Sequence, residues 1–220
     1  MSRIVLACWG SYGDLFPTLA IAARLKTVAT RYVGGSGALV PELDGWQGRE
    51  SRPWRPAGSP DDPALLQRIM EPTRGSAIIV RERIAPCVRE SYDDLAAASE
   101  GADLLVSHPA TFAVPLFAQK HRLPWVSTVL APMSFFSAYD FPVVPNAPRA
   151  IVLRNLGPWT SRLIMKIARR ITLPWVEPVR AFRAHLGLPP GGDPLYEGQF
   201  SPHGTLALFS RLLGDAQRDW

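Results

Sequence analysis

The chain has 220 residues, 47% hydrophobic and 20% charged, which is enough to bury a sizeable core as one large domain or two small ones. Its net charge of +5 is concentrated in residues 149–185, where eight basic residues accompany one acidic residue, and so local an excess argues against a general affinity for nucleic acid. Two cysteines, Cys8 and Cys87, give no disulfide framework, and the first apolar run is too short for a signal peptide, so we expect a reduced, cytoplasmic protein.

The beginning of the chain has a strand–turn–helix pattern. Residues 3–8 are an apolar run that predicts a strand, and residues 14–26 carry apolar side chains at helical spacing. Pro17 fits the first turn of that helix, where its missing N–H is harmless. Residues 29–33 predict a second strand, whereas residues 41–63, with five prolines, are expected to be irregular.

The middle of the chain alternates helices with strands. Residues 74–99 have a helical pattern, which Pro86 should kink or restart. The apolar runs 103–107 and 124–130 predict strands buried on both faces, with a helix at 110–121 between them. This alternation predicts an α/β fold, a Rossmann-like parallel sheet with flanking helices.

Residues 159–173 predict an amphipathic helix. Its apolar face holds Leu163, Ile164, Ile167 and Ile171, and its basic face holds Arg162, Lys166, Arg169 and Arg170. The simplest interpretation is an apolar stripe directed at the core with a solvated basic face, and the alternative is a helix that rests on an anionic membrane. A further helix is expected over residues 175–186, and the apolar run 206–209 is a candidate last strand.

Functional side chains of a parallel sheet gather in the loops beyond the carboxyl ends of its strands. Three such loops are predicted, at residues 9–14, 107–112 and 131–137. Asp14 is either a helix cap or a catalytic group, and His108 is either a structural side chain or a catalytic one. The aromatic stretch 131–141 either packs back on the core or forms the wall of an apolar pocket.

Several common motifs are missing from the sequence. It has no pair of histidines or cysteines at metal-ligand spacing and no D-x-D motif, so a metal-dependent reaction is not expected. The loop Gly10–Asp14 also lacks the G-x-G-x-x-G pattern of dinucleotide-binding proteins.

Three separated stretches carry a resemblance to a known family. The first, GSYGDLFPTLAIAARL, matches the pattern G-S/T-x-G-D-[VL]-x-P at Gly10, Ser11, Gly13, Asp14 and Pro17 and continues to Ala20. The others are DLLVSHPATFAVPLFAQKHRLPWVSTVLAPMSFFSAYD and SPHGTLALFSRLLGDAQRDW. Together they resemble the N-terminal half of family 1, UDP-glycosyltransferase-like glycosyltransferases of the GT-B fold, in the bacterial branch acting on sterols, lipids and other aglycones.

The resemblance implies how the chain is organised. Residues 1–190 would form a Rossmann-like acceptor-binding domain, and residues 191–220 would begin the interdomain linker. The family's C-terminal domain, with its nucleotide-sugar site and His-Gly-Gly-type motif, has no counterpart in these 220 residues. We therefore expect an acceptor-binding half that is inactive or nearly so without a donor domain.

The resemblance also implies roles for residues in the three loops. Asp14 stands where plant members have the histidine that deprotonates the acceptor, and His108 stands roughly at the position of its carboxylate partner, so the dyad is expected with its members exchanged. Contact with the donor diphosphate is expected from Gly10, Ser11 and Gly13 at the helix N-terminus. Contact with an apolar acceptor is expected from Phe16, Thr111, Phe112, Met133, Phe135 and Phe136, together with the loops within 41–72.

The implied reaction is an inverting, metal-independent transfer of a sugar from a UDP- or dTDP-linked donor to a hydroxyl of an apolar acceptor. The nucleotide sugar is a co-substrate, and no cofactor is expected. The expected partners are the acceptor and a donor domain or partner chain, with peripheral membrane contact through residues 159–173 and no nucleic acid. The alternative is a non-catalytic module that binds a small molecule or lipid, or an auxiliary subunit of a glycosyltransferase.

Overall fold

The computed structural model of the protein describes residues 2–25, 29–34, 50–56, 62–141, 152 and 156–220. Within them, six parallel strands form one sheet in the order β3-β2-β1-β4-β5-β6. The strands are β1 (Arg3–Cys8), β2 (Ala29–Gly34), β3 (Glu50–Pro53), β4 (Leu104–Ser107), β5 (Trp125–Val129) and β6 (Thr205–Ala207). This is the doubly wound Rossmann order, so the predicted α/β fold is confirmed.

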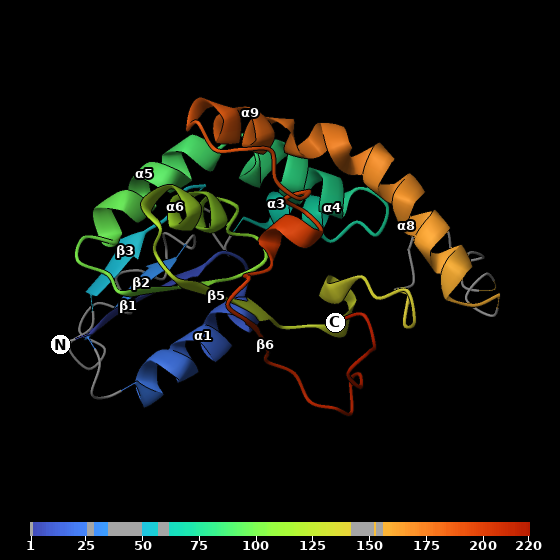
Figure 1. Ribbon diagram of the computed structural model, residues 1–220, viewed down its shortest axis with the longest axis horizontal. Helices are drawn as coiled ribbons and strands as arrows, with labels where there is room; N and C mark the ends of the chain where they lie inside the picture. The colour runs from blue at the N-terminus through green and yellow to red at the C-terminus, as the bar shows by residue number, and fades with distance from the viewer. Residues whose placement is uncertain (1, 26–28, 35–49, 57–61, 142–151, 153–155) are drawn as a thin grey trace.

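Helices cover both faces of the sheet (Figure 1). One face carries α1 (Tyr12–Arg24). The other face carries the thicker layer: α3 (Pro63–Ile69), α4 (Gly75–Ala77), the π-helical segment η2 (Ile78–Ile84), α5 (Val88–Ala98), α6 (Ala113–His121) and α9 (Glu177–His185). The helix α8 (Pro158–Thr172) extends from this layer, joined to α9 through the 3₁₀ turn η5 (Leu173–Val176). Two more 3₁₀ turns, η3 (Pro132–Phe135) and η6 (Glu197–Gln199), lie in the loops after β5 and before β6.

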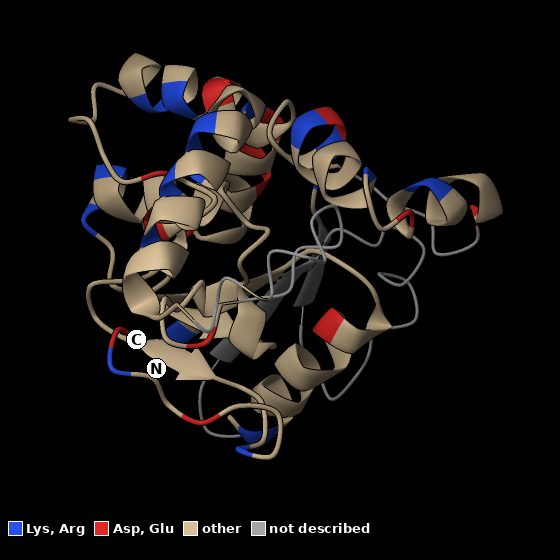
Figure 2. Ribbon diagram, turned by 90° about the vertical axis from the view of Figure 1, so that its right-hand side faces the viewer, with Lys and Arg blue, Asp and Glu red and all other residues tan. Residues whose placement is uncertain are grey.

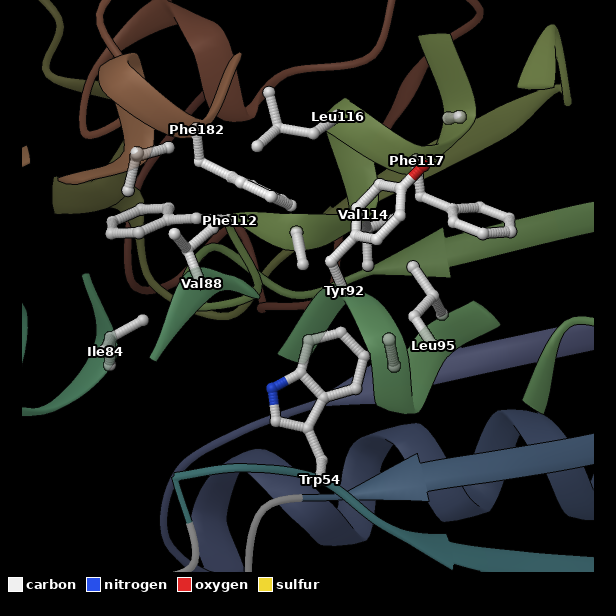
Figure 3. Packing of buried hydrophobic residues seen from close by; sticks show 14 of the residues in the cluster. Trp54, Ile84, Val88, Tyr92, Leu95, Phe112, Val114, Leu116, Phe117 and Phe182 are labelled. Atoms are coloured by element: carbon white, nitrogen blue, oxygen red, sulfur yellow. The ribbon is translucent and has the colours of Figure 1, made fainter. Parts of the chain in front are cut away.

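Alternate residues of β1 pack into two separate cores, because successive side chains of a strand point to opposite faces. Val5 and Ala7 belong to the large cluster under α5, α6 and α9, where Trp54, Tyr92, Phe117 and Phe182 also pack (Figure 3). Leu6 and Cys8 belong to a smaller cluster with α1, built with Leu15, Leu19, Ala22 and Val106. The continuous apolar run of residues 3–8 therefore reflects burial on both faces, as expected for a central parallel strand.

One strand lies where an irregular segment was predicted. β3 covers residues 50–53 within the proline-rich stretch 41–63, and among the described strands it pairs with β2 alone, at the edge of the sheet. An edge strand tolerates proline at a position whose N–H has no ladder partner, and Pro53 is its last residue. The prediction of an irregular segment was wrong there because the sequence Glu-Ser-Arg-Pro has no alternation of apolar and polar residues. Residues 41–49 and 57–61 of the same stretch lie outside the described residues.

Two predicted helices differ in detail from the structure. The first begins at Tyr12 rather than residue 14, so Pro17 lies in the second turn and removes the N–H that would bond the carbonyl of Gly13. The helical pattern of residues 74–99 is divided at Pro86, as predicted, into α4–η2 and α5.

The amphipathic helix α8 is present, but its orientation contradicts the sequence prediction. Leu163, Ile167 and Ile171 are exposed rather than directed at the core, and Ile164 is half-buried. The buried side chains of α8 are instead the polar Thr160 and Ser161. The helical spacing of the apolar residues was predicted correctly, but the body of the protein packs against a different face of the helix.

The sheet extends into the segment that was predicted to begin the linker. β6, close to the expected strand at residues 206–209, pairs with β5 and forms the second edge. The division into an acceptor domain and a linker stays a prediction.

Candidate functional site

The sheet reverses its strand order between β1 and β4, the point at which doubly wound sheets bind their ligands. The loop after β1 supplies Asp14 and the loop after β4 supplies His108. The structure brings these side chains together, with His108 Nε2 3.2 Å from Asp14 Oδ1. Two residues 94 positions apart in sequence thus form a polar pair at the carboxyl edge of the central strands.

Asp14 is fixed by the start of α1. Ser11 is the N-cap, and its hydroxyl accepts the N–H of Gly13 at 3.2 Å, while Asp14 Oδ2 accepts the N–H of Ser11 at 2.7 Å. This reciprocal arrangement is a capping box, in which the third helical residue reaches back to the cap. Asp14 is therefore a capping residue, although the cap position itself belongs to Ser11, and its second oxygen, Oδ1, remains directed at His108.

Gly10 provides the space that Asp14 needs. Its φ is +148°, a conformation that L side chains rarely adopt, and a Cβ at this position would lie 2.2 Å from Asp14 Oδ2. A side chain at residue 10 would therefore displace the carboxylate from the capping box.

His108 is held by a tight turn that follows β4. The Thr111 hydroxyl donates to the carbonyl oxygen of His108 at 2.6 Å and accepts its N–H at 3.1 Å. The Ala110 N–H approaches His108 Nδ1 at 3.3 Å, which assigns the ring proton to Nε2, the atom that faces Asp14. Each ring nitrogen of His108 then has a polar partner.

The two members of the pair differ in exposure. The His108 side chain is 10% exposed and that of Asp14 is 29% exposed. Burial alone would raise the pKa of Asp14, but the hydrogen bonds that it receives from His108 and Ser11 outweigh burial and hold the pKa below its usual value. Asp14 is accordingly an ionised, partly accessible acceptor at neutral pH.

A cleft of about 270 Å³ opens beside this pair. Most of its wall is apolar and comes from η2, the loops after β4 and β5, and the segment before β6. Its apolar lining includes Ile79, Ile84, Phe112, Leu130, Phe136 and Leu195, and its polar lining consists of Asp14, His108, Ser134 and Gln199. A hydrogen-bonded pair in a mostly apolar hollow suits a hydroxyl-bearing apolar molecule.

Of the six residues predicted to bind an acceptor, Phe112 and Phe136 line this cleft. Phe136 follows η3 in a left-handed conformation, with φ 52°, and its ring lies 4.7 Å from that of Tyr196. Thr111 is buried and supports the His108 turn instead. The remaining three line other surfaces: Phe135 stacks on Phe200 and Trp220, Phe16 stacks on Tyr12, and Met133 is exposed.

The three residues predicted to contact a diphosphate lie in the loop around Asp14. The N–H of Ser11 and the N–H of Gly13 are already used within the capping box, and those of Asp14 and Leu15 bond the carbonyl of Ser11. A bound anion would have to replace these contacts. Their contact with a diphosphate stays a prediction.

Leu195 and Gln199 line the cleft, although sequence reasoning had placed them in the linker. Gln199 is buried, and its side-chain amide donates to the carbonyl of Leu195 at 2.6 Å. The Pro- and Gly-rich run before them shows no periodicity that would have placed them at the site.

A second cavity of about 500 Å³ lies between α6, α9 and the segment 188–202. Phe112 lines both this cavity and the cleft.

Among the described residues, no group of three or more His, Cys, Asp or Glu side chains is arranged to hold a metal ion. Within the same residues, no helix is long and apolar enough to cross a membrane.

Comparison with known proteins gives one curated relative and many similar folds. Over 136 residues the chain is 32% identical to the dTDP-epi-vancosaminyltransferase of Amycolatopsis orientalis, covering 59% of this chain and 32% of that protein. The chain thus spans about a third of the length of this relative. No family model matches the chain.

Among solved structures, the glycosyltransferase SsfS6 of Streptomyces sp. SF2575 matches 89% of this chain and 49% of its own, with 18% identity and a TM-score of 0.50. The spinosyn forosaminyltransferase SpnP covers 89% of this chain and 44% of its own, with 17% identity and a TM-score of 0.48. These comparisons give no support for the sterol and lipid branch. In sequence and in fold, the chain is similar to family 1, UDP-glycosyltransferase-like glycosyltransferases of the GT-B fold.

Proposed function

We propose that this chain is the acceptor-binding half of a glycosyltransferase that moves a sugar from a nucleotide-linked donor to a hydroxyl of an apolar acceptor. The observation that supports the proposal most directly is the contact between Asp14 and His108 at the edge of an apolar cleft. The similarity to a dTDP-epi-vancosaminyltransferase favours a dTDP- or UDP-linked donor. Transfer proceeds with inversion, without a metal ion.

Asp14 is the base in this proposal. Both ring nitrogens of His108 are engaged, and its side chain is the less exposed of the two. Asp14 Oδ1 keeps a lone pair beyond the one directed at His108, because each carboxylate oxygen accepts two hydrogen bonds. It accepts the acceptor's proton as the hydroxyl oxygen attacks the anomeric carbon, and the nucleoside diphosphate leaves from the opposite face.

His108 positions the base. Its Nε2–H holds Asp14 Oδ1 in the cleft, and the turn closed by Thr111 fixes the ring. The donor is held mainly by a partner domain or second chain, so the 220 residues alone bind the acceptor with little or no turnover. Acceptor binding can therefore be measured on the 220-residue chain alone, and sugar transfer only when the donor half is present.

The test uses Asp14→Asn in the chain combined with its donor half, on one polypeptide or supplied as a second. Asparagine still accepts the Ser11 N–H through its one carbonyl oxygen, but it is no base and its Nδ2 cannot accept the His108 Nε2–H. We therefore expect kcat to fall about 10²- to 10⁴-fold while the 220-residue chain still binds the acceptor. The matched control is Asp62→Asn, since Asp62 caps α3 through the N–H of Leu65 and does not line the cleft. Equal transfer rates for the two variants would exclude Asp14 as the base.

The alternative is a non-catalytic binding module. It predicts saturable binding of an apolar alcohol to the chain, with no consumption of dTDP- or UDP-sugars when a donor half is present. Hydrolysis or transfer of the sugar that depends on both halves would exclude it.

A further inference from the structure

Helix α8 exposes an apolar stripe along its whole length. Trp159, Leu163, Ile167 and Ile171 follow one another at intervals of four residues and are 72%, 45%, 52% and 64% exposed. Side chains four apart lie on one side of a helix, so these four form a continuous surface. A helix packed on a globular core normally buries such a stripe.

A basic stripe runs beside the apolar one. Arg162, Lys166 and Arg170 are exposed, also at intervals of four residues, and within the described residues none of them pairs with a carboxylate. The Arg162 guanidinium lies over the ring of Tyr139, 5.7 Å from its centroid. The neighbouring Arg169 lies on the inner side and pairs with Glu197 at 3.1 Å. No acidic residue occurs in α8, so its outer surface is purely apolar and cationic.

The position of α8 leaves this surface accessible. Thr160 and Ser161 face the body of the protein, and the helix runs outward past the carboxyl ends of the strands (Figure 1). Viewed from that side, Lys and Arg lie along the helical layer above the sheet, with Asp and Glu positions among them (Figure 2).

We propose that the outer face of α8 binds the surface of a lipid bilayer that contains anionic headgroups. Such a surface complements both stripes at once, because the aliphatic side chains reach the boundary of the acyl chains while the cations remain among the phosphates. Trp159, at the start of the helix, is of the residue type enriched at membrane interfaces. A protein partner would have to match the same three cations with acidic groups of its own, whereas the headgroups supply that charge along the whole stripe.

The experiment is flotation of the 220-residue chain with vesicles of phosphatidylcholine alone and of phosphatidylcholine mixed with phosphatidylglycerol, at low and high salt. Binding is expected to the mixed vesicles and to weaken with salt, because headgroup attraction is screened. The triple change Arg162→Gln, Lys166→Gln, Arg170→Gln should weaken binding about a hundredfold, at roughly fivefold for each cation.

The apolar stripe is tested separately. Ile167→Ser with Ile171→Ser should weaken binding to the mixed vesicles by at least about tenfold, because two apolar side chains no longer leave water. The matched control is Leu66→Ser with Met70→Ser, which removes two exposed apolar side chains four residues apart on another segment. The control for the cations is the triple change Arg74→Gln, Arg122→Gln, Arg211→Gln, which removes as much charge elsewhere.

Three results would overturn the proposal. One is the absence of binding to the mixed vesicles, and another is binding that the control triple weakens as much as the α8 triple does. The third is a dimer in solution that the two isoleucine changes dissociate while vesicles stay unbound, since the occupant of the stripe is then a second copy. None of these results bears on the Asp14–His108 pair, so this inference and the proposed function can fail independently.

Discussion

Helices α1 and α8 each carry an apolar stripe, and the two stripes lie in opposite environments. In α1, Leu15, Leu19 and Ala22 are buried against β1 and β4, and a capping box closes the first turn. In α8, the apolar stripe faces outward, and Gly157 precedes the helix without a side-chain cap. Periodicity thus specifies that a stripe exists, whereas the rest of the fold decides what covers it.

The largest difference between the two helices is expected in how much stability is lost when an apolar side chain is truncated. Leu15→Ala should lower the free energy of unfolding by about 2–5 kcal/mol, because Leu15 is only 4% exposed and its removal leaves a cavity. Ile167→Ala should change it by less than about 0.5 kcal/mol, because the side chain already contacts water. Urea denaturation of both variants measures this, and equal losses would show that the stripe of α8 is covered within the chain.

The glycines before the two helices offer a second comparison. Gly10→Ala should cost about 1–3 kcal/mol of backbone strain, with an added cost for moving Asp14, because the new Cβ would meet its carboxylate. Gly157 also has a positive φ, but a Cβ there meets nothing within 4 Å. Gly157→Ala should therefore carry the strain alone, and thermal melts should rank Gly10→Ala as the less stable variant.

The cap of α1 is a smaller contribution. Ser11→Ala removes the acceptor of the Gly13 N–H and should cost about 1 kcal/mol. The control is Ser76→Ala, an exposed serine with an expected change within about 0.5 kcal/mol. Identical unfolding midpoints for both variants would contradict a capping role for Ser11.

The smallest expected effect is the pH dependence of the stability that Asp14 contributes. Because the folded pKa of Asp14 is lowered, the stability it contributes is present above about pH 4, the unfolded value, and is lost as pH falls through the folded pKa. The difference in unfolding free energy between the wild-type chain and Asp14→Asn should therefore shrink on acidification below that pH. The difference for Ile167→Ala should stay constant, since this substitution adds or removes no titrating group.

Strands buried on both faces were readable from the sequence because burial leaves a continuous apolar run, as in Leu104–Ser107 and Trp125–Val129. The edge strand Glu50–Pro53 was not, since it is held by backbone pairing with β2 and its sequence is polar. The direction of the α8 stripe was also unreadable, because it depends on contacts made far away in sequence.

The site was predictable in part for the same reason. Asp14 and His108 each follow a readable strand, and parallel strands bring their carboxyl ends to one edge. Gln199 and Leu195 reach the cleft through a segment without a periodic pattern, so only the folded chain places them there. Phe135 is aromatic like Phe136, but its neighbours Phe200 and Trp220 decide where its ring packs.

The capping box also restricts how this site could have diverged. Asp14 Oδ2 receives both the N–H and the hydroxyl of Ser11, in space that exists because residue 10 is glycine. An imidazole at position 14 offers one acceptor nitrogen, so it could not replace both bonds and also face residue 108. A change from this dyad to one with histidine on the helix therefore requires further changes in the loop before α1. Exchanging Asp14 and His108 alone would remove hydrogen bonds that Ser11 now donates to Asp14 Oδ2.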